Sequence, residues 1–223
     1  MKKKNKTDIQ LANIEQGLSK SEQFIEDNQK PISLIIAIII LVFLSAYSYN
    51  SFYKKPLNSK AQDELFVAEQ YFEKANYRKA LDGDDTFLGL SEICENFSNT
   101  TSGNLAYYYA GISHLRLGEF ESAIKKLEKF KSKDPILLSI AKAGIGDAFS
   151  EIGQTNESIE YYKKAISVTE NESITPFFLI KCAQAYEKLE DYSNAKSCYT
   201  KIKTNFPNSN EAKNIEKFLN KIN

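Results

Sequence analysis

Cysteine, glycine, proline, histidine and tryptophan are all scarce in this chain of 223 residues. The three cysteines are too few for a disulfide scaffold, and no Cys-X-X-Cys pair suggests a zinc site. The 29 basic and 29 acidic residues cancel, so the chain lacks the basic excess that phosphate binding requires, which argues against a nucleic-acid-binding protein. Nine glycines and five prolines are below ordinary usage and favour a largely helical fold.

Catalytic and cofactor-binding motifs are missing as well. Gly144 and Gly146 begin a dinucleotide-binding pattern, but Phe149 stands where the third glycine belongs. A calcium loop that started at Asp82 would need glycine at position 87 and glutamate at position 93, where Phe87 and Ile93 stand, so we expect a solvated loop at residues 82–85. The single histidine, His114, falls where a packed core side chain is expected. We therefore predict that the protein is not an enzyme and has no catalytic residues, metal site or cofactor.

Residues 31–53 contain no charged residue and are rich in isoleucine and leucine. At about 1.5 Å per residue this segment would form a helix of about 34 Å, long enough to cross a membrane. A buried core helix would need a large domain to cover it. A cleavable signal peptide fits less well, because the preceding lead is too long and no small-residue cleavage site follows. We predict an uncleaved transmembrane signal anchor, with aromatic residues in the headgroup layer at Tyr47, Tyr49, Phe52 and Tyr53.

Polar segments flank this span. In the tail, residues 1–30, apolar residues at Leu11, Ile14, Leu18 and Ile25 predict a short amphipathic helix that either docks on a partner or is mostly solvated. We expect residues 54–60 to form a linker. Lysines close to the span are slightly more numerous on its C-terminal side, so charge bias does not decide the membrane orientation.

Beyond the linker, an ordered pattern of small and large residues recurs about every 35 residues. In each block a large residue follows a small one by three positions, as in Gly111 with His114, Gly146 with Phe149 and Ala183 with Tyr186. The small residues would let two helices approach closely, and Pro135 and Pro207 are expected to end the second helices. A weaker unit precedes these three, interrupted by the acidic run, with helix expected to resume near Phe87.

This pattern resembles the tetratricopeptide repeat, in which each unit is a pair of helices. We therefore expect an all-α fold: an N-terminal transmembrane helix followed by a tetratricopeptide-like α-solenoid of about four helix pairs with a C-terminal capping helix. The expected parts are a degenerate first repeat at residues 61–103, three repeats at residues 104–208 and the capping helix at residues 209–223.

The first helices of stacked repeats line a concave face, which is the usual peptide-binding surface. Here we predict a groove that is apolar and aromatic toward the membrane end and charged toward the C-terminus. Tyr108 and Tyr109 are the best candidates for hot spots; packing of these aromatic residues against neighbouring repeats is an equally weighted alternative. The candidate partner-binding residues are Phe66, Phe72, Tyr108, Tyr109, Ile112, Arg116, Asp147, Glu151, Lys181, Gln184 and Lys188.

Co-chaperones of this repeat class hold a C-terminal carboxylate with lysine, asparagine and arginine side chains. The matching positions of this chain are Tyr108, Ile112, Gly144, Phe177 and Lys181. Since only Lys181 fits, the comparison disfavours the capture of a chaperone tail.

Two of the cysteines, Cys182 and Cys198, are expected on the two helices of one repeat and could lie near each other. The spacing leaves open whether they are buried free thiols or a pair. In either case, Cys94 has no expected cysteine partner.

The order of tail, span and repeat array resembles the ancillary SecYEG translocon subunit family of bacterial inner membranes, in its Bacteroidota form. The likeness rests on residues 21–31, 80–84 and 103–120. It implies a single-pass inner-membrane protein with a cytoplasmic N-terminus and a periplasmic repeat domain. The implied function is a protein-binding adaptor or scaffold. Its implied partners are translocon subunits, exported polypeptides or periplasmic chaperones.

The alternative is a cytoplasm-facing tethered scaffold or receptor for another membrane complex. In either case, we expect the protein to bind neither nucleic acid nor a small-molecule substrate.

Overall fold

The computed structural model describes residues 24, 25 and 27–222. The amphipathic helix predicted for the tail lies mainly outside these residues. The contacts divide the chain into two units, residues 1–56 and residues 57–223. Along the described chain, α2 (Gln29–Ser48), the π-helix η1 (Tyr49–Lys54) and α3 (Lys55–Glu73) follow one another without a break.

The first unit is dominated by α2, which is apolar on every face. None of its residues is buried by the described chain, and its leucines and all of its isoleucines except the half-buried Ile32 are exposed. A helix of this kind requires an apolar environment on all sides. By length and composition, α2 can cross a membrane. In the following η1, the rings of Tyr49 and Tyr53 stack with centroids 5.3 Å apart.

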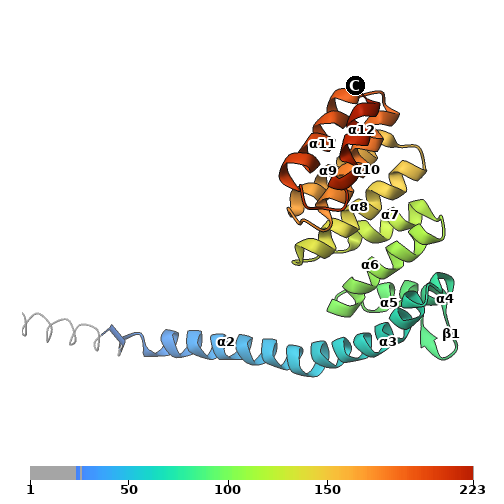
Figure 1. Ribbon diagram of the computed structural model, residues 1–223. Coiled ribbons are helices and arrows are strands. Elements are labelled where there is room, and N and C mark those ends of the chain that lie inside the picture. Colours follow the sequence, from blue (N-terminus) through green and yellow to red (C-terminus); the bar gives the residue numbers. More distant parts are fainter. Residues whose placement is uncertain (1–23, 26, 223) are drawn as a thin grey trace, which may run out of the picture. The chain divides into compact units, whose positions relative to one another are not determined.

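The second unit contains three regular helix hairpins. Figure 1 shows them stacked in chain order, from green to red. This arrangement confirms the prediction of an all-α solenoid. The hairpins are α6 (Thr101–Arg116) with α7 (Phe120–Lys129), α8 (Pro135–Glu151) with α9 (Thr155–Val168), and α10 (Thr175–Lys188) with α11 (Tyr192–Asn205).

Small residues bring the two helices of each hairpin together. A Cβ atom on Gly111 would lie 2.4 Å from Cγ of Leu127, so α6 could not carry a larger residue there without moving α7. In the next hairpin, a Cβ atom on Gly146 would lie 2.7 Å from Cε1 of Tyr162. The predicted small positions are therefore the points of closest approach.

The same turn ends the first helix of all four units. Its central residue has a left-handed backbone, with φ between 58° and 80° at Ala75, Gly118, Gly153 and Glu190. In each unit the next backbone N–H donates to the carbonyl oxygen five residues earlier, which belongs to Tyr71, His114, Phe149 or Tyr186, over 2.9–3.0 Å. This bond is typical of a helix C-terminus that ends in a left-handed residue.

The degenerate unit differs from the expectation in its second half. It contains α3, α4 (Tyr77–Asp82), the strands β1 (Gly83–Asp84) and β2 (Phe87–Leu88), and α5 (Leu90–Asn96). The expected solvated loop is instead an antiparallel hairpin, and helix resumes at Leu90 rather than near Phe87. Phe87 is only 6% exposed because its ring stacks on Tyr71 with centroids 4.9 Å apart. Asp84 closes the hairpin turn by accepting hydrogen bonds from Thr86.

Prolines mark the repeat boundaries, although one acts differently from the expectation. Pro135 begins α8 instead of ending α7, because Asp134 caps the new helix and a proline in the first turn costs no hydrogen bond. Pro207 follows the end of α11, as expected. The 3₁₀-helix η2 (Ala212–Asn214) and α12 (Ile215–Lys221) then cover the last hairpin with Ile215 and Leu219 buried.

Candidate protein-binding groove

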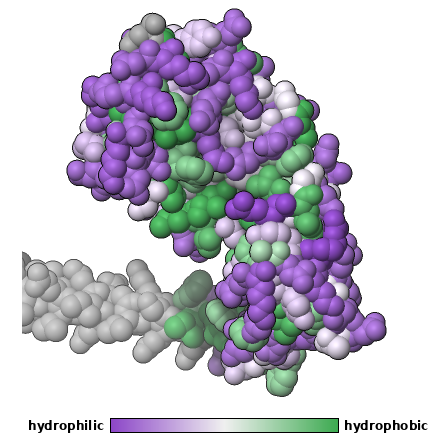
Figure 2. All heavy atoms as spheres, turned by 45° about the vertical axis from the view of Figure 1, so that its right-hand side comes forward, coloured by the Kyte–Doolittle hydropathy of each residue, from purple (hydrophilic) through white to green (hydrophobic). Residues whose placement is uncertain are grey.

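A groove with a cavity volume of about 770 Å³ lies on the face formed by α6, α8 and α10. We call it the first-helix groove, since each wall is the first helix of a regular repeat. Figure 2 shows apolar side chains gathered around a hollow on one face of the molecule and bordered by hydrophilic ones. Seven of the eleven candidate residues line the groove: Ile112, Arg116, Asp147, Glu151, Lys181, Gln184 and Lys188.

The floor of the first-helix groove is apolar. Ile112, Leu115 and Ile140 contribute aliphatic surface, and the ring of Phe177 is 47% exposed. The small residues Ala143 and Gly144 lie in α8 at the centre of the groove. Because neither has a long side chain, the groove stays open for the side chain of another protein.

An internal polar network fixes one wall. The carboxylate of Asp147 accepts a hydrogen bond from Lys181 Nζ at 2.7 Å and another from the hydroxyl of Tyr162 at 2.8 Å. Burial and the nearby Asp147 carboxylate raise the pKa of Tyr162, so this hydroxyl stays a donor. Lys181 Nζ also lies 4.8 Å from the centroid of Phe177. Asp147 and Lys181 are thus engaged with each other across α8 and α10, which leaves less of either charge for a ligand.

Other polar side chains of the groove have no such partner. Arg116, Glu151 and Gln184 are exposed and form no hydrogen bond or ion pair with any other described residue. Within the part of the chain that the structure describes, Lys188 Nζ donates only to the hydroxyl of Ser150, at 3.0 Å. The groove therefore offers a cation, an anion and an amide beside an apolar floor, which suits a polypeptide with mixed side chains.

Four candidate residues lie outside this groove. Phe66 is 59% exposed and lines a separate pocket of about 810 Å³ between α3 and the start of α6, together with Asp63 and Glu69. The remaining three are Phe72, Tyr108 and Tyr109.

These three aromatic residues pack against the chain itself. The ring of Tyr109 lies 4.9 Å from that of Phe72 and 5.5 Å from that of Tyr108, and Tyr108 lies 5.3 Å from Phe130. The Tyr109 hydroxyl donates to the Glu69 carboxylate, and burial together with this bond raises the pKa of Tyr109. The structure thus uses them to join α3 to α6 and α6 to the end of α7, the packing alternative that the sequence left open.

Phe177 is an exposed aromatic residue of the groove that the candidate set omits. It lies four residues before Lys181 and seven before Gln184 on α10, so helical spacing places all three on one face. Four of the five positions that were matched to co-chaperones line this same groove: Ile112, Gly144, Phe177 and Lys181. Lys181, the one residue that fits the co-chaperone pattern, is paired with Asp147.

Other chemistry-bearing residues are engaged elsewhere. His114 Nδ1 lies 2.6 Å from the Glu119 carboxylate, which also pairs with Arg78, and these hydrogen bonds lower the pKa of Glu119. Among residues 24–25 and 27–222, no cluster of three or more histidine, cysteine, aspartate or glutamate side chains could hold a metal ion.

The comparison with protein families decides what this helix array is. Family models described as tetratricopeptide repeat match residues 105–135, 141–172 and 179–209. The chain contains tetratricopeptide repeats. The predicted resemblance to this repeat is confirmed, and such an array is a scaffold for protein–protein interaction.

Known relatives share only part of their length with this chain. Tetratricopeptide repeat protein 29 of Macaca fascicularis is 26% identical over 145 residues, which are 63% of this chain and 29% of that protein. The Homo sapiens protein of the same name is 25% identical over 140 residues, 60% of this chain and 28% of its own length. The chain thus spans less than a third of these curated relatives. A crystal structure of BtubC (BKLC) from P. vanneervenii covers 73% of this chain and 65% of its own, at 14% identity and a TM-score of 0.42.

The two kinds of aromatic residue should differ in their effect on stability. We expect Tyr109→Ala to lower the free energy of unfolding by about 2–3 kcal/mol, because its packing against Phe72 and Tyr108 is lost. Phe177→Ala should change it by less than about 1 kcal/mol, because that ring is half exposed. Urea unfolding of the full chain in detergent, followed by circular dichroism, measures both. Equal destabilisation by the two substitutions would contradict this division.

Proposed function

We propose that this protein is a membrane-anchored adaptor in which α2 spans a membrane and the first-helix groove binds a polypeptide segment of a partner. The observation that carries the proposal is the combination of exposed Phe177 with Arg116, Glu151 and Gln184, which have no partners among the other described residues. An exposed aromatic ring between unengaged charges is a typical anchor point at a protein interface.

The membrane part of the proposal rests on α2. Apolar side chains are exposed on every face of this helix, and water is an unfavourable solvent for such a surface. Tyr47, Tyr49 and Tyr53 follow at its C-terminal end, where tyrosine favours the interface between lipid and water.

We place this adaptor beside the Sec translocon, with the repeats in the periplasm. The support is the resemblance of residues 21–31, 80–84 and 103–120 to the ancillary translocon subunits. The groove chemistry agrees with it, because exported polypeptides expose mixed apolar and charged segments before they fold. Long domains also cross a membrane largely regardless of a small lysine bias.

The second candidate is a cytoplasmic scaffold tethered by the same helix. Lys54, Lys55 and Lys60 favour it, because lysines that follow a span closely tend to stay in the cytoplasm. The fold and the groove are the same in both candidates, so only the side of the membrane and the partner differ.

Protease access separates the two candidates. Protease added to spheroplasts that contain the full chain should digest the repeat domain, while a cytoplasmic marker stays intact. A known periplasmic marker must be digested in the same sample. Survival of the repeat domain under these conditions would exclude the periplasmic orientation.

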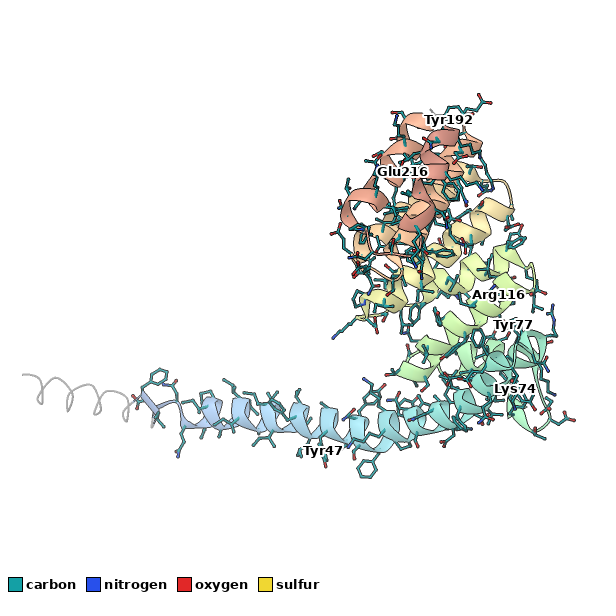
Figure 3. All side chains as sticks on the ribbon, in the orientation of Figure 1. Tyr47, Lys74, Tyr77, Arg116, Tyr192 and Glu216 are labelled. Carbon is teal, nitrogen blue, oxygen red and sulfur yellow. The ribbon has the colours of Figure 1, made fainter. Side chains whose placement is uncertain are left out.

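A photo-reactive amino acid at position 177 tests the partner. Tyr192 on α11 is a matched control, because it is 49% exposed against 47% for Phe177 and lies outside the first-helix groove. Figure 3 shows Tyr192 at the far end of the domain from Arg116. We expect crosslinks to Sec components, exported polypeptides or periplasmic chaperones from position 177 and few from position 192, identified by mass spectrometry.

The crosslinking result can contradict the proposal in two ways. If positions 177 and 192 give the same products, the first-helix groove is not the binding surface. If position 177 gives specific products that include no Sec component, exported protein or periplasmic chaperone, the groove stands and the translocon assignment fails.

A further inference from the structure

A pair of thiols lies in the last regular repeat, away from the first-helix groove. Cys182 on α10 is 1% exposed, whereas Cys198 on α11 is partly exposed. The side chain of Cys198 packs against the buried cluster that contains Cys182, and both residues line one pocket. Neither cysteine is in a disulfide, so α10 and α11 bring two free thiols close together.

An open pocket lies beside the two cysteines. It has a volume of about 540 Å³, lies among α9, α10 and α11, and is lined by both cysteines, two lysines and several polar residues. Lys201 pairs with Glu170 at 3.1 Å, and both line the pocket. Lys163 forms no ion pair with a described residue. The pocket thus carries a positive charge near the thiols that is available to an anionic ligand.

The two thiols differ in exposure and in pKa. The neighbouring Cys182 thiol lowers the pKa of Cys198, and Lys163 and Lys201 act in the same direction. The neighbouring Cys198 and burial raise the pKa of Cys182. An accessible thiol with a lowered pKa beside a buried second thiol is the usual arrangement for attack followed by resolution. Cys94, by contrast, is buried, and burial raises its pKa to about 11.

We propose that Cys198 is a thiol–disulfide exchange site for small anionic disulfides such as glutathione disulfide, with Cys182 as the resolving thiol. The Cys198 thiolate attacks one sulfur of the disulfide, forms a mixed disulfide and expels one small thiolate. The Cys182 thiol then loses its proton to water and attacks the Cys198 sulfur, which expels the second small thiolate. One disulfide and two protein thiols become one protein disulfide and two small thiols.

This bond would link the two helices of one hairpin. It would close a loop over residues 183–197 in the unit that α12 covers, and a cross-link of this kind stabilises the folded state mainly by restricting the unfolded chain. The last repeat would then unfold at a higher temperature in an oxidising compartment than in a reducing one.

The test is to treat the reduced full chain in detergent with glutathione disulfide and to follow each cysteine by mass spectrometry. We expect loss of two hydrogens, a peptide pair linked through Cys182 and Cys198, a higher midpoint of thermal unfolding, and unmodified Cys94 as the internal control. If Cys94 reacts as fast as Cys198, or if no link between Cys182 and Cys198 forms, the proposal is overturned. The unsubstituted chain alone gives this answer.

Two substitutions assign the roles. Cys182→Ser should trap the glutathione adduct on Cys198, whereas Cys198→Ser should leave Cys182 unmodified. An adduct on Cys182 in the second variant would reverse the assigned order. Lys163→Gln should slow the reaction with glutathione disulfide about threefold or more and leave the reaction with the uncharged hydroxyethyl disulfide unchanged. Equal slowing of both reactions would exclude recognition of negative charge by the pocket.

Discussion

The close approach of two helices within each repeat is the constraint on which the rest of the structure depends. In α6 and α8 a glycine stands where any Cβ atom would overlap Leu127 or Tyr162 of the second helix. In α10 the matching position is Ala183, fully buried in the cluster that contains Tyr199. These contacts hold each repeat together as a closely packed helix pair that can stack on the next. The stacking places α6, α8 and α10 on one face, so the groove is a consequence of small residues that lie behind it.

The groove separates residues that hold its shape from residues that are available to a partner. Asp147 joins three helices, because it lies on α8 and accepts hydrogen bonds from Tyr162 on α9 and Lys181 on α10. With this wall fixed, Arg116 and Glu151 project without internal partners, and a ligand would not have to break existing bonds to reach them. Such preorganisation lowers the cost of binding more effectively than added contact area does.

More features of the fold than of the site could be predicted from the sequence. Regular spacing of small and large residues predicts helix hairpins, and seven candidate residues do share one groove, because the repeat period fixes which residues share a face. It does not show which of them face another part of the chain. Tyr109 reaches Phe72 of an irregular unit that breaks the period, and Phe87 lies in a short strand where its ring stacks on Tyr71. The left-handed turns at Ala75 and Glu190 could not be predicted from the positions of glycine, because neither residue is a glycine. Each costs about 1–2 kcal/mol of backbone strain.

The central claim is that the first-helix groove is the surface that a partner covers. Hydroxyl-radical footprinting tests it without any substitution, because Phe177 and Tyr192 are oxidisable and almost equally exposed. The oxidation of each ring is compared between the purified full chain and the same chain in its native membranes. The account predicts that Phe177 is protected in the membranes while Tyr192 is oxidised to the same extent in both samples. Unchanged oxidation of Phe177, or equal protection of the two rings, would contradict it.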